Sequence, residues 1–132
     1  MYLEVPIGGP GGDGDWPAGC TVRRLDAVRI LSSSEPDIAV RLSSARDAFV
    51  KDLARFPAEL LEVKRSLNRT AIGQVVAGRR MFERQYGARP TVAVVCAASD
   101  SALEWVCSEE AIAVHVVPVS SPSDPELDLT LR

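Results

Sequence analysis

The second half of the chain alternates between apolar runs and helix-like segments, and this alternation constrains the fold more than any other feature. Apolar runs lie around residues 60–63, at 91–98 and at 112–119. A helix pattern separates the first two runs, and a short helix that opens with the residues SALE separates the last two. Strands joined by helices lie parallel in one sheet with right-handed crossovers, so we expect three parallel strands here.

The longer of the two helices has recognisable start and stop signals. Asn68 or Thr70 is a suitable N-cap, and the pattern continues to about Tyr86. Gly87 and Pro90 follow as residues that end helices. We therefore predict one long helix between the first two apolar runs.

The first half reads as shorter strands and one further helix. Strands are predicted within residues 2–9, where Pro6 interrupts the pattern, within 20–31 and within 38–42. A helix is predicted from a capping-box-like SARD at Ser44 up to Pro57. Together with the second half, this gives an α/β fold with a central mixed sheet flanked by helices.

Length and composition indicate one globular domain. We expect a single domain over residues 1–119 and a flexible, acidic C-terminal tail over 120–132. The chain is 46% hydrophobic, but no apolar run is long enough to span a bilayer, and no secretory signal pattern opens it. Its three cysteines show no CxxC spacing. These features predict a cytoplasmic protein with no membrane segment.

Two charged residues in the first of the parallel runs raise a question of chemistry. Glu62 and Lys64 alternate with Val63, so their side chains point to the same face of a strand. Asp26 lies between apolar residues in an earlier strand. Two carboxylates and a phosphate suffice to hold Mg²⁺ or Mn²⁺, but the same residues would also serve as ion pairs with one another and with neighbouring arginines.

Asp26 and the segment ELLEVKRSLNRTAIGQ resemble the core of the PD-(D/E)xK nuclease superfamily, which has the restriction-endonuclease-like fold. The resemblance implies that Asp26 and Glu62 bind a metal, that Lys64 assists the attacking water, and that Gln74 supports the site. It implies a metal-dependent nuclease, with DNA a more expected substrate than RNA. A chain of this fold that binds nucleic acid or a partner protein without cleaving it is the alternative.

Some assignments remain open at the level of sequence. Asp37, in a literal Pro-Asp pair, is an alternative to Asp26, although Ser-rich turns use Asp for backbone reasons. The family commonly carries a Glu on an N-terminal helix that this chain lacks, and Glu4 is a candidate to replace it as a further metal ligand. Gly78 stands where some branches of the family have Tyr.

Positive charge is concentrated between Lys64 and Arg89, whereas the chain after Ser99 is acidic and the net charge is −3. A basic face of this kind attracts phosphates. Candidate nucleic-acid contacts are therefore Arg65, Arg69, Arg79 and Arg80. Trp16 is a further candidate, for stacking on bases. A homodimer or a partner protein would supply specificity in so small a chain.

Overall fold

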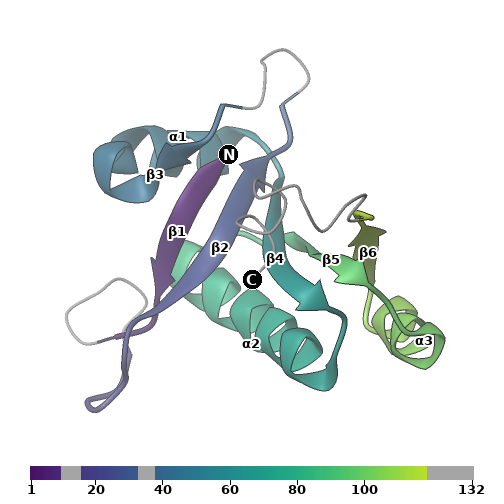
Figure 1. Cartoon of the computed structure of the whole chain (residues 1–132). Coiled ribbons are helices and arrows are strands. Elements are labelled where there is room, and N and C mark those ends of the chain that lie inside the picture. The colour runs from purple at the N-terminus through teal and green to yellow at the C-terminus, as the bar shows by residue number, and fades with distance from the viewer. Residues whose placement is uncertain (10–15, 33–37, 119–132) are drawn as a thin grey trace.

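The computed structural model describes residues 1–9, 16–32 and 38–118 and confirms the α/β fold. A six-stranded mixed sheet, in the order β3-β1-β2-β4-β5-β6, is flanked by three helices (Figure 1). The elements are β1 (Tyr2–Ile7), β2 (Arg23–Ile30), β3 (Val40–Arg41), a 3₁₀ turn (Leu42–Ser44), α1 (Arg46–Arg55), β4 (Ala58–Ser66), α2 (Arg69–Tyr86), β5 (Thr91–Ala98), α3 (Ser101–Glu109) and β6 (Ile112–Val116).

The three later strands follow the sequence prediction. Strands β4, β5 and β6 are parallel neighbours, and α2 and α3 connect them. The side chain of Asn68 caps α2 by accepting a hydrogen bond from the backbone N–H of Ala71 at 2.8 Å. Gly87 ends the helix with φ 72°, a left-handed conformation that favours glycine. No helix among the described residues is long and apolar enough to cross a membrane.

Several details of the earlier half differ from expectation. Pro6 does not break β1, because β3 pairs only with Tyr2 and Leu3 and leaves β1 as an edge where Pro6 lies. Ser44 does not cap α1 but belongs to the preceding 3₁₀ turn. The N-cap is Ala45, which makes no side-chain hydrogen bond.

The N-cap of α3 is also displaced from the expected residue. Its cap is Asp100, one residue before the predicted opening, and the carboxylate accepts from the backbone N–H of Leu103 at 3.0 Å. Asp is among the preferred N-cap residues, so Asp100 rather than Ser101 caps the helix.

An aromatic corner, formed by Tyr2, Phe49, Phe82 and Tyr86, joins β1 to α1 and α2. The ring centroids of Tyr2 and Phe49 are 4.9 Å apart, and those of Phe49 and Tyr86 are 5.3 Å apart. Phe49 and Phe82 are fully buried. Burial and a 2.6 Å hydrogen bond to Asp52 raise the pKa of Tyr2 to about 12.

The core-facing side of β1 changes partway along the strand. Tyr2, Val5 and Ile7 are all buried, although strict alternation would put Tyr2 on the face opposite to the other two. Glu4 between them has φ 54°. This left-handed residue moves the inward-facing positions by one, so that both halves of β1 contribute to one core.

Candidate functional site

The candidate site lies where β2 and β4 separate. Their antiparallel pairing begins at Ile30 opposite Ala58 and stops at Ala27 opposite Leu61. Beyond this point β2 remains paired with β1, while β4 continues beside β5 (Figure 1). We call this place the fork. The next pair in register would be Asp26 opposite Glu62, so the two carboxylates predicted from sequence stand at its opening.

Asp26 replaces part of the missing backbone pairing. One oxygen of its carboxylate, Oδ2, accepts a hydrogen bond from the backbone N–H of Val63 at 2.9 Å. A carboxylate from β2 thus binds the backbone of β4 at the point where the regular ladder ends. This bond holds the Asp26 side chain between the two strands and fixes where its charge lies.

Glu62 and Lys64 lie together on β4, as their spacing predicts. Lys64 Nζ is 3.5 Å from Glu62 Oε1, and the side chains are 27% and 13% exposed, respectively. Part of the ion-pair alternative is therefore present in the structure. Arg29, one of the arginines near Asp26 in the sequence, lies 3.9 Å from Glu59.

The electrostatic environment of Glu62 is unfavourable to its charge. Burial raises the pKa of its carboxyl, and so do the adjacent charge of Asp26 and a hydrogen bond between the two carboxyl groups, whereas Lys64 lowers it. The net direction is upward. Lys64 alone therefore does not compensate for placing two carboxylates together in a partly buried position.

Helix α2 forms a groove beside Glu62. The groove has a volume of about 510 Å³, and its lining includes Glu62, Gln74, Thr70, Gly73 and Ala77. Gly73 has open space where a Cβ would stand. The structure therefore brings Gln74 to the same groove as Glu62, and small helix residues leave room for a ligand between them.

Of the two remaining candidate metal ligands, Glu4 lines a groove that Asp26 also lines and lies 3.6 Å from Arg41. Asp37 falls outside the described residues. Within residues 1–9, 16–32 and 38–118, no three acidic, His or Cys side chains are grouped for metal binding. Mg²⁺ usually takes one or two carboxylates and completes its shell with water and substrate oxygens, a pattern that Asp26 and Glu62 fit.

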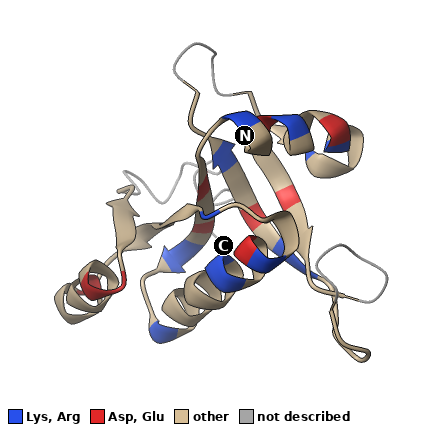
Figure 2. Cartoon of the chain, turned by 180° about the vertical axis from the view of Figure 1, so that it is seen from behind, with Lys and Arg blue, Asp and Glu red and all other residues tan. Residues whose placement is uncertain are grey.

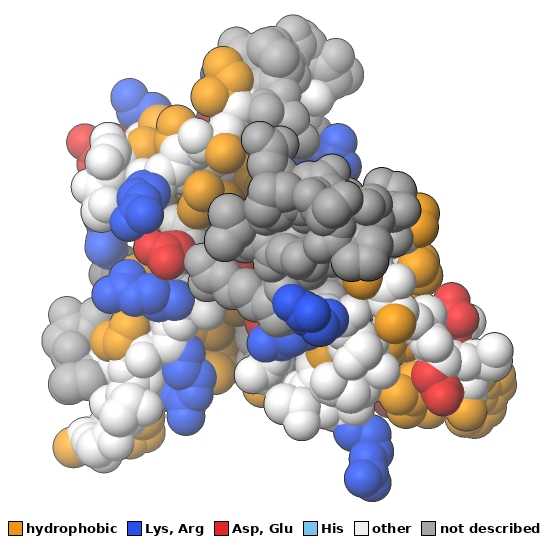
Figure 3. Space-filling view, viewed as in Figure 1, with side chains coloured by type: hydrophobic (Ala, Val, Ile, Leu, Met, Phe, Trp, Pro, Cys, Tyr) orange, Lys and Arg blue, Asp and Glu red, His pale blue; other side chains and the backbone are white. Residues whose placement is uncertain are grey.

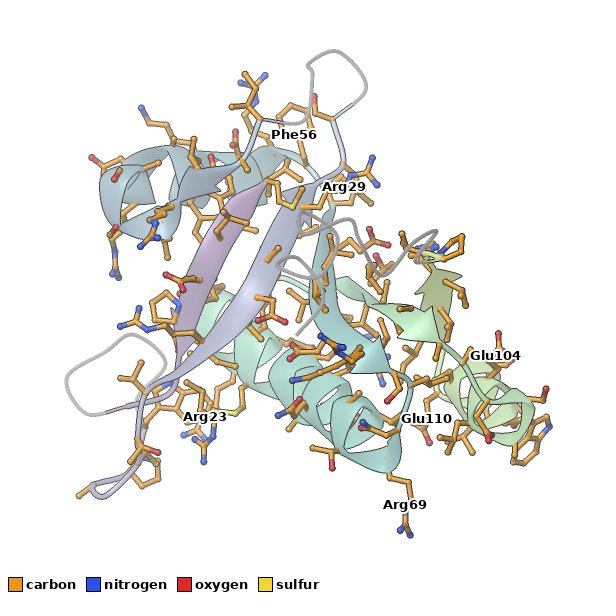
Figure 4. The ribbon with its side chains drawn as sticks, viewed as in Figure 1. Arg23, Arg29, Phe56, Arg69, Glu104 and Glu110 are labelled. Atoms are coloured by element: carbon orange, nitrogen blue, oxygen red, sulfur yellow. The ribbon has the colours of Figure 1, made fainter. Side chains whose placement is uncertain are left out.

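The four arginines predicted to contact phosphates lie at several places along β4 and α2. Arg69 points away from the molecule at the start of α2 (Figure 4), and Arg79 donates to the backbone oxygen of Glu110 at 3.0 Å. Arg65 and Arg80 are exposed, on β4 and α2 respectively. Figure 2 shows basic positions spread along α2.

Sequence reasoning missed the arginines that do line the groove. Arg23 and Arg24 come from β2 and border the groove that holds Glu62, and Arg23 lies beside α2 in Figure 4. Their position directly before Leu25 and Asp26 was the available signal. Trp16 is held against α2, where its ring lies 4.5 Å from the Arg84 guanidinium and its Nε1 donates to Gln85.

Comparison with known proteins gives no family for this chain. No protein-family model matches it, and neither the curated proteins nor the solved structures contain a significant match. The resemblance to PD-(D/E)xK nucleases therefore stays a prediction, and the case for function depends on the chemistry of the fork.

Proposed function

We propose that this protein is a metal-dependent nuclease of the PD-(D/E)xK type that hydrolyses phosphodiester bonds, in DNA rather than RNA. The observation that carries the proposal is the meeting of Asp26 and Glu62 at the fork, with Lys64 3.5 Å from Glu62. Asp26 lies far from Glu62 and Lys64 in the sequence, and the register of β2 against β4 brings it to Glu62.

The carboxylate pair is suited to a divalent cation. Burial, and after it the adjacent charge of Asp26, raise the pKa of Glu62. A bound cation would offset the negative charge of both carboxylates, so Asp26 and Glu62 are the residues that would hold Mg²⁺ or Mn²⁺. When bound, the metal supplies charge neutralisation at the phosphate and a more acidic water.

The surrounding residues have complementary roles in this proposal. Lys64 orients the attacking water and stabilises negative charge that develops on the phosphate. Gln74 lines the same groove as Glu62 and offers an amide to hydrogen-bond the water or the scissile phosphate. The small side chains of Gly73 and Ala77 leave space for the nucleic-acid backbone at this point.

A second candidate is a nuclease-like chain that binds nucleic acid or a partner protein without cleaving. The ion pair between Lys64 and Glu62 favours it, because an internal partner partly neutralises the carboxylate. Under this alternative, replacing Lys64 would leave the binding of nucleic acid or of the partner protein unchanged. Either function is compatible with a homodimer or with a partner protein that supplies specificity.

The test is cleavage of labelled linear, branched and single-stranded DNA with Mg²⁺ or Mn²⁺. We expect Asp26→Asn and Lys64→Ala to lower the rate by about 10²–10³-fold, the range seen when one transition-state contact is removed. Lys51→Ala, on the exposed surface of α1, is the matched control and should cleave normally. Calorimetric titration of Mn²⁺ measures metal binding without substrate. If the wild type neither cleaved any of these substrates nor bound Mn²⁺, that result would contradict the proposed nuclease.

A further inference from the structure

A second groove adjoins the fork on the other face of the sheet. It has a volume of about 660 Å³. Leu61 and Val63 line it, and they alternate along β4 with Glu62, which faces α2. Arg24 and Leu25 line both grooves, so both border β2 directly before Asp26. Its apolar floor is formed by Leu3, Ala27, Leu61 and Val63.

The rim of this groove is basic. Arg24 on β2 and Arg41 on β3 line it, and the side chain of Arg41 is 73% exposed. A neighbouring hollow continues from both arginines to Arg46 on α1. Figure 3 shows basic side chains gathered over this side of the sheet, with acidic atoms between them. The rim therefore offers several guanidinium groups to successive phosphates.

Basic side chains outnumber acidic ones across the two hollows, with Arg24, Arg41 and Arg46 against Glu4 and Asp26. Glu4 lies 3.6 Å from Arg41, and Asp26 accepts the N–H of Val63. An apolar floor beneath a basic rim suits a ligand with a flat apolar part and a negative backbone. Single strands expose their base faces, whereas a duplex stacks them inside.

We propose that this groove binds one unpaired strand of DNA, with a base on the apolar floor and the flanking phosphates against Arg24 and Arg41. The inference deepens the proposed nuclease, since it names single-stranded ends or flaps as the substrate and rests on that function for its role. The strand would pass from this groove, beside Arg24, to the carboxylates at the fork.

Binding is measured by fluorescence anisotropy in EDTA, so that no cleavage is required. The probe is a labelled thymidine oligonucleotide of about twelve nucleotides. We expect Arg24→Ala/Arg41→Ala to weaken binding about tenfold or more and to reduce the salt slope by about 1.4, since each single-strand phosphate contact contributes about 0.7. Arg89→Ala/Arg55→Ala, which removes the same charge from two other exposed positions, should bind within about twofold of wild type.

The apolar floor is tested by comparing ligands of equal charge. We expect the thymidine strand to bind more tightly than an all-abasic strand or a blunt duplex of the same length, and Leu61→Ser to abolish that preference. Equal binding of thymidine and abasic strands, or an unaffected Arg24→Ala/Arg41→Ala variant, would overturn the proposal. Strand binding with this pattern but without cleavage in Mg²⁺ would retain the groove and reject the nuclease.

Discussion

Strands β1 and β2 cross two regions of opposite character. Near the start of β1, the aromatic corner is closed and apolar, with Phe49 and Phe82 fully buried. Toward the start of β2, the fork is open and charged, and backbone pairing with β4 has stopped at Ala27. The same sheet is therefore held by apolar packing at one end and by a side-chain bond from Asp26 at the other.

The comparison indicates that the aromatic corner stabilises the fold, whereas the fork carries the groups suited to chemistry. The corner buries large rings with favourable edge contacts, which stabilises the fold. The fork places Asp26 and Glu62 together and raises the pKa of Glu62, which disfavours the ionised folded state. Functional sites commonly retain such unfavourable groups, because the chemistry needs them.

The largest expected effect on stability is at the corner. Phe49→Ala should lower the free energy of unfolding by about 3–5 kcal/mol, because it leaves a cavity among three aromatic rings. Urea denaturation measures the loss. Val50→Ala, at the next and 54% exposed position of α1, should change it by less than about 0.5 kcal/mol. Similar losses for both variants would show that the corner does not dominate stability.

At the fork, a smaller effect should depend on hydrogen bonding rather than on volume. Asp26→Ala leaves the N–H of Val63 without its acceptor and should cost about 1–2 kcal/mol in unfolding free energy. Asp26→Asn keeps an acceptor oxygen and should lose less than about 0.5 kcal/mol while losing Mn²⁺ binding. Equal destabilisation by Ala and Asn would mean that this hydrogen bond does not secure the fork.

At the N-terminus of α2, the helix that forms the groove, loss of the cap should lower the free energy of unfolding by about 1 kcal/mol. Asn68→Ala removes the cap on the N–H of Ala71 and should lower the unfolding free energy by that amount. Asn68→Asp keeps an acceptor and is the matched control. Thermal denaturation of both variants measures the difference, and a fully stable Asn68→Ala protein would contradict it.

The smallest expected effect is a gain in stability rather than a loss, and it concerns Glu62. Because the folded state raises the pKa of Glu62, it holds that proton more tightly than the unfolded chain does. Ionised Glu62 therefore reduces stability as pH rises from its unfolded pKa through its folded one. Glu62→Gln should be more stable than wild type at about pH 8, and the advantage should shrink toward about pH 4.

The control for Glu62→Gln is Glu59→Gln on the same strand. Glu59 lies 3.9 Å from Arg29, so the same substitution removes an attractive contact there. Denaturation curves across this pH range should show a gain for one variant and no gain for the other. If Glu62→Gln were less stable than wild type at high pH, the contact of Glu62 with Lys64 would outweigh the effects of burial and of the Asp26 charge.

Local patterns in the sequence were enough for most elements of the fold. Periodicity and caps predicted α2, with Asn68 or Thr70 as its N-cap and an end near Tyr86, because helix ends are defined by neighbouring residues; the structure has Asn68 as the cap. The predicted N-caps of α1 and α3 were wrong. A serine was expected at each, and the structure has Ala45 and Asp100 instead. The extension of β1 through Pro6 depended on how far β3 reaches, which no local pattern records.

For the site, the sequence determined that Glu62 and Lys64 would be neighbours, because alternation along one strand fixes them. Only the tertiary structure decided that Asp26 meets Glu62, through the register of β2 against β4 and the bond to Val63. It also decided that Arg24 and Arg41, on different strands, border one groove. The physical reason is that local periodicity sets the face on which a side chain lies, whereas register and strand separation arise from contacts between distant segments.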